Sequence, residues 1–433
     1  MDFITQTKQV PVVGAYDVVV CGGGPAGLIA AIAAARGGAR TALVERYGFL
    51  GGMATAGLVA PISVFNYNGR RIIDGIPWEF VERLAEIGGA EEEKPLGNIT
   101  FSPEKYKIIA QRMLLEAGVT LYFHSYLTGC RTEQGRITHI VVENKNGAEA
   151  IAARYFIDAT GDADLAHQAG VPMQPAGATL QPASLIFMLG GVDTDALPML
   201  RHSQQGVNYH DLAIRETLER LRETQEIPTF GGPWYCGVLS KGVVLLNMTR
   251  TQADMADNRE ATEAECLLRE HVQLFTELLR RHVPAFRDAT LLCTATQTGV
   301  RETRRIKGFH TLTGEEYLNA VDFPDAISRG CHPVDIHAAS STQQRCEFLR
   351  EAAFIPYRTL IAPDFPNLLV AGRSFSADAV ASASVRVQAS VMGLGQAAGA
   401  AAAQCVRTGA DVAEVDVEQL RRTLTEYGAN LTA

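Results

Sequence analysis

The stretch Val18-Val-Val-Cys-Gly-Gly-Gly-Pro-Ala-Gly-Leu28 decides the fold of this chain. It places Gly22, Gly24 and Gly27 at the spacing G-x-G-x-x-G, directly after an apolar run of strand length. Glycines at these positions allow a tight strand-to-helix turn and let backbone N–H groups approach a pyrophosphate, whose charge the helix N-terminus stabilises. The spacing alone is a weak signal, so the flanking segments have to decide what it means.

The flanking segments complete a βαβ unit. Residues 25–36 are rich in Ala, Leu and Ile and predict a helix, which Gly37 and Gly38 end. Residues 41–45 form a second apolar strand, so the unit requires a parallel sheet with a right-handed crossover. This strand ends at Glu45, where an acid accepts hydrogen bonds from ribose hydroxyls and disfavours a 2′-phosphate. The unit therefore predicts a site for NAD or FAD, without choosing between them.

Composition excludes several classes of function. The chain has 433 residues, of which 47% are hydrophobic, and this length suits two or three domains with large buried cores. Its formal net charge of -9 and the absence of a dense Lys/Arg run argue against nucleic-acid binding. The first residues lack a secretory signal pattern, and segment 391–406 suits a buried helix better than a membrane span. The eight cysteines form no C-x-x-C pair, which predicts reduced thiols in a cytoplasmic protein and no metal site.

The segments beyond the βαβ unit extend the α/β pattern. Residues 46–75 form a glycine-bearing loop whose length is typical of a functional segment. Residues 76–86 and 102–117 predict helices, the second with Ser102 as its cap. Residues 119–159 contain short strands separated by turn residues and predict a β-meander.

Further segments resemble one protein family. Residues 45–55, Asp158-Ala-Thr-Gly-Asp162 and Asn367-Leu-Leu-Val-Ala-Gly-Arg373 are similar to the FAD-dependent oxidoreductases of the glutathione-reductase-like flavoprotein superfamily. More distantly, the chain resembles the fumarate reductase and succinate dehydrogenase flavoproteins. The resemblance continues through residues 300–306, 323–327, 334–337, 355–358 and 393–399. It implies that the dinucleotide is FAD.

The resemblance also implies which residues hold FAD. The loop after Glu45 would lie along the pyrophosphate and flavin, and turn 160–162 would close on the cofactor from the meander side. The helix opening at 395–397 would direct its N-terminus at the flavin pyrimidine ring, which is negatively charged when reduced, although its Gly/Ala composition equally suits close packing. The implied FAD-binding residues are Gly22, Gly24, Pro25, Ala26, Gly27, Glu45, Arg46, Gly51, Gly52, Met53, Ala54, Thr160, Gly161, Asp162, Gly372, Arg373, Gly395, Gln396 and Ala397.

One departure from the resemblance concerns the attachment of FAD. Flavoproteins of the succinate dehydrogenase type often carry a flavin-linking His in the loop where this chain has Met53. No His occurs between Met1 and Phe123. We therefore expect FAD to be bound non-covalently.

Arginine, histidine and tyrosine side chains in the matching segments are the candidates for substrate binding. A guanidinium offers a planar fork to a carboxylate, and Tyr or His can move a proton while hydride passes to or from flavin N5. The alternative for the arginines is that they form ion pairs with nearby glutamates. His332 and His337 could suggest a metal site, but no third ligand stands near them in the sequence. The candidates are Arg301, Arg304, Arg305, His332, His337, Tyr357, Arg358 and Arg386. We expect Arg301, His337 and Arg386 to orient the substrate and assist proton transfer, with Tyr357 and Arg358 as further catalytic residues.

The predicted fold is α/β. A Rossmann-like FAD-binding domain with a discontinuous chain should carry an inserted, mixed α+β substrate domain. We expect residues 1–170 to form the N-terminal part of the FAD-binding domain, 171–352 the substrate domain and 353–433 the C-terminal part. The last part should add a strand over 367–371 and a helix starting near Gly393.

The predicted activity is that of an FAD-dependent oxidoreductase. Hydride would move between flavin N5 and a small polar organic substrate, expected to carry a carboxylate, and a further electron donor or acceptor would complete the cycle. A flavin-dependent C=C reductase and an NAD(P)H-dependent flavin monooxygenase are the enzymatic alternatives; no second convincing G-x-G-x-x-G indicates a resident nicotinamide. A non-catalytic FAD-binding partner subunit is a third alternative, which the matching Arg, His and Tyr residues disfavour.

Overall fold

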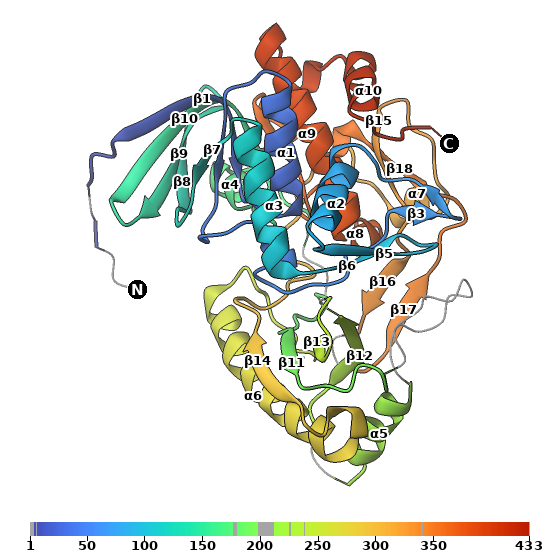
Figure 1. Cartoon of the computed structure of the whole chain (residues 1–433). Coiled ribbons are helices and arrows are strands. Elements are labelled where there is room, and N and C mark those ends of the chain that lie inside the picture. Colours follow the sequence, from blue (N-terminus) through green and yellow to red (C-terminus); the bar gives the residue numbers. More distant parts are fainter. Residues whose placement is uncertain are drawn as a thin grey trace.

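The computed structural model describes residues 4–5, 7–175, 180–197, 212–224, 227–237, 239–338 and 341–432. Within these ranges the chain forms a larger body on a seven-stranded sheet and a smaller lobe on a four-stranded sheet. Figure 1 shows the lobe below the larger body, with the N-terminal arm leaving the edge of the large sheet. No helix in these ranges combines the length and apolar character that a membrane crossing requires.

The parallel part of the large sheet contains the predicted βαβ unit. Its strands follow the order β7 (Thr120–Tyr122), β2 (Thr41–Val44), β1 (Val12–Cys21), β10 (Gly147–Asp158) and β19 (Leu368–Val370). All four neighbouring pairs run parallel. Because β19 comes from the C-terminal end of the chain, two distant segments build one sheet, as the sequence predicted.

Strand β10 also begins the antiparallel part of the same sheet. Its first half pairs antiparallel with β9 (Arg136–Asn144), which pairs in turn with β8 (Tyr126–Glu133). The predicted β-meander is therefore confirmed for these three strands. Its expected first strand, β7, instead joins the parallel sheet beside β2.

Burial on both faces explains why residues 18–21, the last part of β1, form a continuous apolar run. Val18 and Val20 face the core under the helices, whereas Val19 and Cys21 face the core under the meander. Each of these side chains is at most 1% exposed. Successive side chains of a strand point to opposite faces, and here both faces are covered, so no polar position is left.

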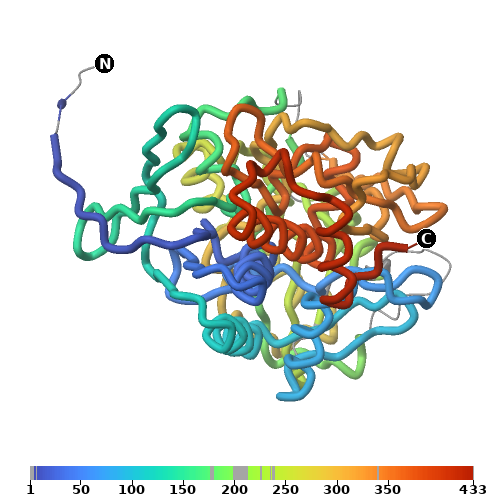
Figure 2. Tube along the Cα trace, turned by 90° about the horizontal axis from the view of Figure 1, so that it is seen from above, coloured from blue at the N-terminus to red at the C-terminus, as the bar shows by residue number. Residues whose placement is uncertain are grey.

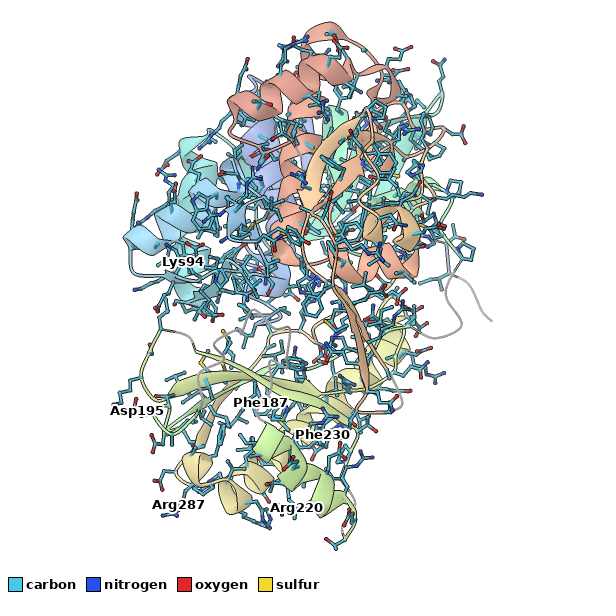
Figure 3. The ribbon with its side chains drawn as sticks, turned by 90° about the vertical axis from the view of Figure 1, so that its right-hand side faces the viewer. Lys94, Phe187, Asp195, Arg220, Phe230 and Arg287 are labelled. Atoms are coloured by element: carbon cyan, nitrogen blue, oxygen red, sulfur yellow. The ribbon has the colours of Figure 1, made fainter. Side chains whose placement is uncertain are left out.

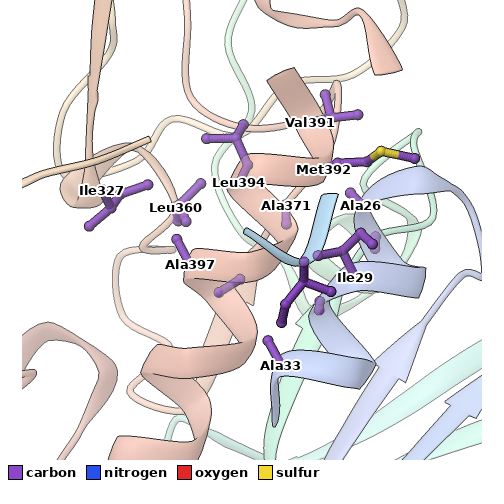
Figure 4. Packing of buried hydrophobic residues seen from close by; sticks show 14 of the residues in the cluster. Ala26, Ile29, Ala33, Ile327, Leu360, Ala371, Val391, Met392, Leu394 and Ala397 are labelled. Atoms are coloured by element: carbon purple, nitrogen blue, oxygen red, sulfur yellow. The ribbon is translucent and has the colours of Figure 1, made fainter. Parts of the chain in front are cut away.

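Helices α1 (Pro25–Arg36) and α9 (Gln388–Thr408) pack together over the sheet, beside α3 (Pro103–Glu116). Figure 2 shows this arrangement from above, and Figure 4 shows buried side chains of α1, α9 and neighbouring segments in the same core. A Cβ on Gly395 would fall 2.1 Å from the Ala26 carbonyl oxygen, so the close approach of the two helices requires glycine there. The predicted helix start near Gly393 is wrong, since α9 begins at Gln388.

The smaller lobe is an antiparallel sheet covered by two helices. Its order is β12 (Phe230–Gly237), β13 (Val243–Thr249), β11 (Phe187–Gly190) and β14 (Thr290–Thr294). The helices are α5 (Leu212–Arg222) and α6 (Asn258–His282). Figure 3 shows Phe187 and Phe230 at this sheet, and both lie in the core of the lobe.

The remaining elements complete the larger body and join it to the lobe. They are β3 (Asn66–Tyr67), β4 (Arg70–Arg71), α2 (Ile76–Glu86), β5 (Ala90–Glu93), β6 (Asn98–Phe101), α4 (Asp164–Ala169), α7 (Gly314–Leu318), β15 (Ala326–Gly330), β16 (Val334–His337), β17 (Gln344–Glu347), β18 (Ala353–Pro356), α8 (Ala379–Val385) and α10 (Val417–Glu426). The bounds of α2 are those predicted. The ribbon of β16 and β17 runs from the larger body toward the lobe (Figure 1).

The residues that form the two apolar cores can be compared with the predicted boundaries of the inserted domain. The core of the lobe draws on residues 185–295, with Leu58 from the larger body. Leu312, Tyr317 and Val334 lie instead in the core of the larger body, together with α9. We therefore propose that the inserted part ends near residue 295 and not at 352. The division into domains otherwise stays a prediction.

Candidate active site

The glycine turn after β1 has the geometry that the sequence predicted. A Cβ on Gly27 would lie 1.9 Å from the Gly22 carbonyl oxygen, so this glycine permits close packing of the turn on its helix. A Cβ on Gly24 would meet only the Gly52 Cα, at 3.9 Å, so the backbone of Gly24 borders open space. Glu45 stands beside the turn, and its Oε2 accepts a hydrogen bond from the Gly23 N–H at 2.7 Å.

A cavity of about 1400 Å³, its mouth included, extends from this turn to the lobe. It lies at the carboxyl ends of β1, β2 and β10, where open α/β sheets bind ligands. Many of the residues predicted to hold FAD line it. These are Gly22, Gly24, Pro25, Ala26, Glu45, Arg46, Gly52, Met53, Thr160, Gly161, Gly372 and Arg373.

The other predicted FAD-binding residues are not among the lining residues described. They are Gly27, Gly51, Ala54, Asp162, Gly395, Gln396 and Ala397. The last three lie two turns inside α9, where Oε1 of Gln396 accepts a hydrogen bond from the Ile76 N–H at 2.7 Å. The expectation that a helix opens at 395–397 is therefore wrong.

The N-terminus of α9 does face the cavity, but at earlier residues. Val387 is its N-cap, provides no capping side chain, and lines the cavity with Gln388. Nε2 of Gln388 donates to the Val59 carbonyl oxygen at 2.7 Å, whereas its Oε1 is buried without a hydrogen-bond partner among the described residues. The first N–H groups of a helix have no partner within it, so this end of the cavity favours a negatively charged group.

Asp162 positions Arg373 instead of lining the cavity. Its Oδ1 accepts hydrogen bonds from Arg373 Nη2 and Thr303 Oγ1, both at 2.5 Å. Burial alone would raise the pKa of Asp162, but the charge of Arg373 and the hydrogen bonds hold this pKa below its usual value. Arg373 Nε is buried and has no hydrogen-bond partner among the described residues.

Arg301 and Arg386 line the far end of the cavity. Arg301 is 9% exposed, and its Nη1 donates to the Pro182 carbonyl oxygen at 2.6 Å and to Ser184 Oγ at 2.7 Å. Burial lowers the pKa of Arg301 to about 9, and the charge of Arg386 adds to this effect. Arg386 Nη2 donates to the Asp335 carbonyl oxygen at 3.2 Å, while its Nε is buried without a hydrogen-bond partner among the described residues.

His337 is held from both sides of its ring. Nδ1 lies 2.9 Å from Arg250 Nη2, and Nε2 lies 2.9 Å from Asp335 Oδ2. A guanidinium can only donate, so Nδ1 accepts and Nε2–H donates to the carboxylate. Burial lowers the pKa of His337 to about 4, helped by the charge of Arg301, so the ring is neutral at pH 7.

Asp335 is the carboxylate at the centre of this cluster. Burial opposes its charge, but the hydrogen bond from His337 and the charge of Arg386 hold the pKa of Asp335 well below its usual range. Burial also lowers the pKa of Arg250 to about 10. The guanidinium groups of Arg250, Arg301 and Arg386 thus all interact electrostatically with the Asp335 carboxylate. The other carboxylate that acts on Arg386, that of Glu302, is paired with Arg305, so positive charge is in excess among these groups.

Other predicted substrate residues lie elsewhere. The hydroxyl of Tyr357 is buried and donates to the Val412 carbonyl oxygen at 2.8 Å, and Arg358 pairs with Asp325 at 2.9 Å. Neither is among the lining residues described, so the structure does not support their catalytic assignment. Arg304 and Arg305 pair with Asp164 and Glu302. His332 lines the cavity, with Nδ1–H donating to the Pro333 carbonyl oxygen at 2.7 Å.

Comparison with protein families decides the class of this chain. The family described as FAD dependent oxidoreductase matches residues 17–424. The chain belongs to this family. It is therefore an FAD-dependent oxidoreductase, as the sequence indicated, and FAD is the cofactor that the family implies.

Three proteins that are similar to this FAD-dependent oxidoreductase share either a short matching segment or a low overall sequence identity with it. Dihydrolipoyl dehydrogenase of Trypanosoma brucei brucei is 60% identical over 42 residues, which are 10% of this chain and 9% of that protein. The geranylgeranyl bacteriochlorophyll reductase-like protein Ta0516 of Thermoplasma acidophilum is similar at 14% identity and a TM-score of 0.46, covering 96% of this chain and 82% of its own. The flavin-dependent brominase Bmp2 is similar at 16% identity and a TM-score of 0.49, covering 94% and 83%.

The residues of this oxidoreductase fit FAD from the glycine turn to the N-terminus of α9. The open space at Gly24 would admit a pyrophosphate, and Glu45 stands where the adenosine ribose is expected. The buried donor at Arg373 Nε and the N-terminus of α9 suit the phosphates and the flavin pyrimidine ring. Within the described part of the chain, no group of three or more His, Cys, Asp and Glu side chains is arranged to hold a metal.

Sequence reasoning missed several residues of the site. Arg250 and Asp335 fix His337, and Gln297 accepts hydrogen bonds from the Arg46 and Tyr47 side chains at the cavity wall. Asp335 stands two residues from His337 in a matching segment and could have been found by that spacing. Arg250 and Gln297 carry no such signal, because their neighbours in space are far away in sequence.

Proposed function

We propose that this FAD-dependent oxidoreductase binds FAD non-covalently in the cavity and acts on a small organic substrate that carries a carboxylate or a similar anionic group. Bound FAD supplies hydride transfer at its N5 atom. The observation that carries the proposal is the cluster of Arg250, Arg301 and Arg386 near the Asp335 carboxylate, where Glu302 is already paired with Arg305. Buried positive charge in excess costs free energy, which an anionic ligand would offset.

Arg386 and Arg301 are the groups proposed to bind the anion. Arg386 has a buried Nε–H without an acceptor among the described residues, and a carboxylate would fill that place. Arg301 is fixed by the Pro182 carbonyl and Ser184 hydroxyl, so its guanidinium is oriented before a ligand arrives. A fixed planar fork binds a carboxylate in one orientation, which places the reacting carbon of the substrate relative to the flavin.

His337 is proposed as a positioning residue of this cluster. Both of its ring nitrogens are engaged, one by Arg250 and one by Asp335, and its lowered pKa keeps it neutral. This arrangement does not favour the proton transfer expected of His337 from the sequence. It holds Asp335 in place, and Asp335 in turn holds Arg386 through its carbonyl oxygen.

The discontinuous FAD-binding domain and the inserted lobe are part of the same proposal. FAD would lie along Gly24, Glu45 and Arg373 in the larger body, and the substrate would lie between that body and the lobe. Ser184, Ile186 and other lining residues just before or within the lobe's sheet support this placement. An acid-precipitated sample tests the non-covalent binding, because FAD should then stay in the supernatant.

The decisive experiment is an anaerobic substrate screen that follows the absorbance of oxidised FAD at about 450 nm, because FAD carries the chemistry. We expect carboxylated donors to bleach the oxidised protein, or carboxylated acceptors to restore the colour of the reduced protein. Restoration by an unsaturated acid would identify a C=C reductase. Bleaching by NADPH followed by oxygen use only with an aromatic substrate would identify a monooxygenase. A protein that binds FAD and reacts with no organic donor or acceptor would contradict the proposal.

A further inference from the structure

A second chamber adjoins the far end of the FAD cavity. It encloses about 1120 Å³, its mouth included. The lining residues that it shares with the cavity are Ala60, Pro61, Ser63, Ile186, Asn247, His332, Asp335 and His337. The loop over residues 46–75, the β5–β6 hairpin, the lobe's sheet and the β16–β17 ribbon all contribute to its walls. A molecule that reaches the arginine cluster therefore also faces this chamber.

The walls of the chamber are largely apolar. Leu58, Val64, Ile186 and Leu245 line it, and each is at most 7% exposed. Trp234 adds an aromatic wall. A short polar acid would leave these surfaces facing water, whereas an apolar ligand body would bury them.

A polar group lies in the chamber beyond the cavity. Asn98 of β6 lines the chamber but is not among the lining residues of the cavity. It is 1% exposed, and its Nδ2 has no hydrogen-bond partner among the described residues. Leaving a buried amide donor unpaired is costly, so an acceptor on the ligand would stabilise the complex. Glu93 lines the same chamber, and its carboxylate disfavours a second anionic group on the ligand.

We propose that the substrate is an amphipathic monocarboxylate. Its carboxylate would bind at Arg301 and Arg386, and an apolar body at least as large as an aromatic ring would occupy the chamber. A neutral acceptor, such as a carbonyl oxygen, would bind Asn98 Nδ2. This inference rests on the proposed function and adds the substrate class to it.

A ligand series on the FAD-loaded protein tests the inference. Acetate, phenylacetate, 2-naphthylacetate, succinate and phenylacetamide are titrated, and the change in FAD absorbance reports binding. We expect phenylacetate to bind roughly tenfold or more tighter than acetate, and 2-naphthylacetate tighter still, because apolar area is buried. Succinate should bind no better than acetate. Equal affinities for acetate and 2-naphthylacetate would overturn the inference alone, whereas equal affinities for phenylacetate and phenylacetamide would overturn the proposed function.

Two cysteines offer a matched pair of variants. Cys346 lines the chamber and Cys293 does not, while both are exposed residues on strands. We expect Cys346→Phe to weaken 2-naphthylacetate binding about tenfold and to leave acetate binding unchanged, because the new ring fills apolar space. Cys293→Phe should change neither affinity. The same loss in both variants, or in neither, contradicts the assignment of the chamber.

Asn98→Leu tests the far end of the chamber. The wild-type protein should prefer 4-acetylphenylacetate over 4-isopropylphenylacetate, since only the ketone offers an acceptor to Nδ2. The ratio of the two affinities should fall to about one in the variant, because leucine is similar in size but donates no hydrogen bond. An unchanged ratio would remove the acceptor from the proposed substrate class.

Discussion

Arg250 fixes the protonation state of His337. Its Nη2 lies 2.9 Å from Nδ1 of the imidazole, which must accept because a guanidinium has no lone pair to offer. The ring proton is thereby placed on Nε2, where it binds Asp335. A neutral ring with one tautomer thus links Arg250 to Asp335, whose backbone carbonyl oxygen accepts a hydrogen bond from Arg386.

This arrangement predicts a pH dependence of stability. The pKa of His337 falls from 6.5 to about 4 on folding, so the unfolded chain binds a proton that the folded chain does not. Neutral His337 therefore contributes about 3 kcal/mol to the free energy of unfolding at pH values above 6.5. This contribution is lost as the pH falls toward 4. His337→Gln keeps an acceptor and a donor but cannot titrate. Its free energy of unfolding, from urea titrations at several pH values, should approach or exceed that of wild type as the pH falls. A constant difference between the two proteins would contradict the assignment.

Alanine substitutions at Gly24 and Gly27 should have different effects, the first on FAD binding and the second on folding. A methyl group on Gly24 would enter the open space where a pyrophosphate fits, and its φ of -70° suits alanine. We expect Gly24→Ala to keep the melting temperature of the FAD-free protein and to lose at least about tenfold in FAD affinity, because the backbone N–H groups can no longer approach the phosphates. Fluorescence titration with FAD measures this.

Gly27→Ala is the contrasting variant. Its Cβ would lie 1.9 Å from the Gly22 carbonyl oxygen, so the turn itself would have to move. This variant should fail to fold or melt at a markedly lower temperature with or without FAD. Equal FAD affinity in wild type and Gly24→Ala would show that the pyrophosphate does not lie at this turn.

Much of the fold could be predicted because its signals are local. The glycine turn, the acid at Glu45 and the bounds of α2 follow from residues close together in sequence, where strand length and helix capping act. The start of α9 could not be placed, because its N-cap residue Val387 carries no capping side chain and Gly393 resembles a helix boundary. Packing against α1, which requires Gly395 and Gly399, continues the helix through these glycines.

The substrate site was harder to predict because it depends on contacts between distant residues. Arg301, Arg386 and His337 were expected at the site and line the cavity. Tyr357 and Arg358 carry the same chemistry in an equally good motif, yet the fold turns one into the core and the other toward Asp325. Which side chain faces the cavity is decided by tertiary packing, and motif similarity does not report it.

Arg386 and Arg358 therefore form a matched pair for testing the substrate site. Arg386→Gln should weaken binding of a carboxylated substrate about 10- to 150-fold, since a hydrogen bond to a charged group is lost. FAD content should not change. Arg358→Ala should keep the turnover and KM of wild type, because Arg358 pairs with Asp325 away from the cavity. Steady-state kinetics with the substrate from the anaerobic screen measure both, and a larger effect at Arg358 would contradict the site.

The position of the α9 N-terminus predicts at which residue an added charge changes the reduction potential of the flavin. Gln388 lines the cavity at the first turn, whereas Gln396 lies two turns further along the same helix. Gln388→Glu would place negative charge near the ring that becomes negative on reduction. We expect this charge to raise the free energy of the reduced FAD by about 1.4 kcal/mol, which makes the two-electron midpoint potential about 30 mV more negative.

Gln396→Glu is the matched control for this potential. Its carboxylate can still accept the hydrogen bond from the Ile76 N–H that Gln396 accepts at 2.7 Å, but it lies roughly 12 Å further along the helix axis. Charge interactions weaken with distance, so the shift should be less than half of that in Gln388→Glu. Titration of both FAD-loaded variants against dyes of known potential gives the two values. A larger shift in Gln396→Glu would return the flavin to residues 395–397, where the sequence alone had placed it.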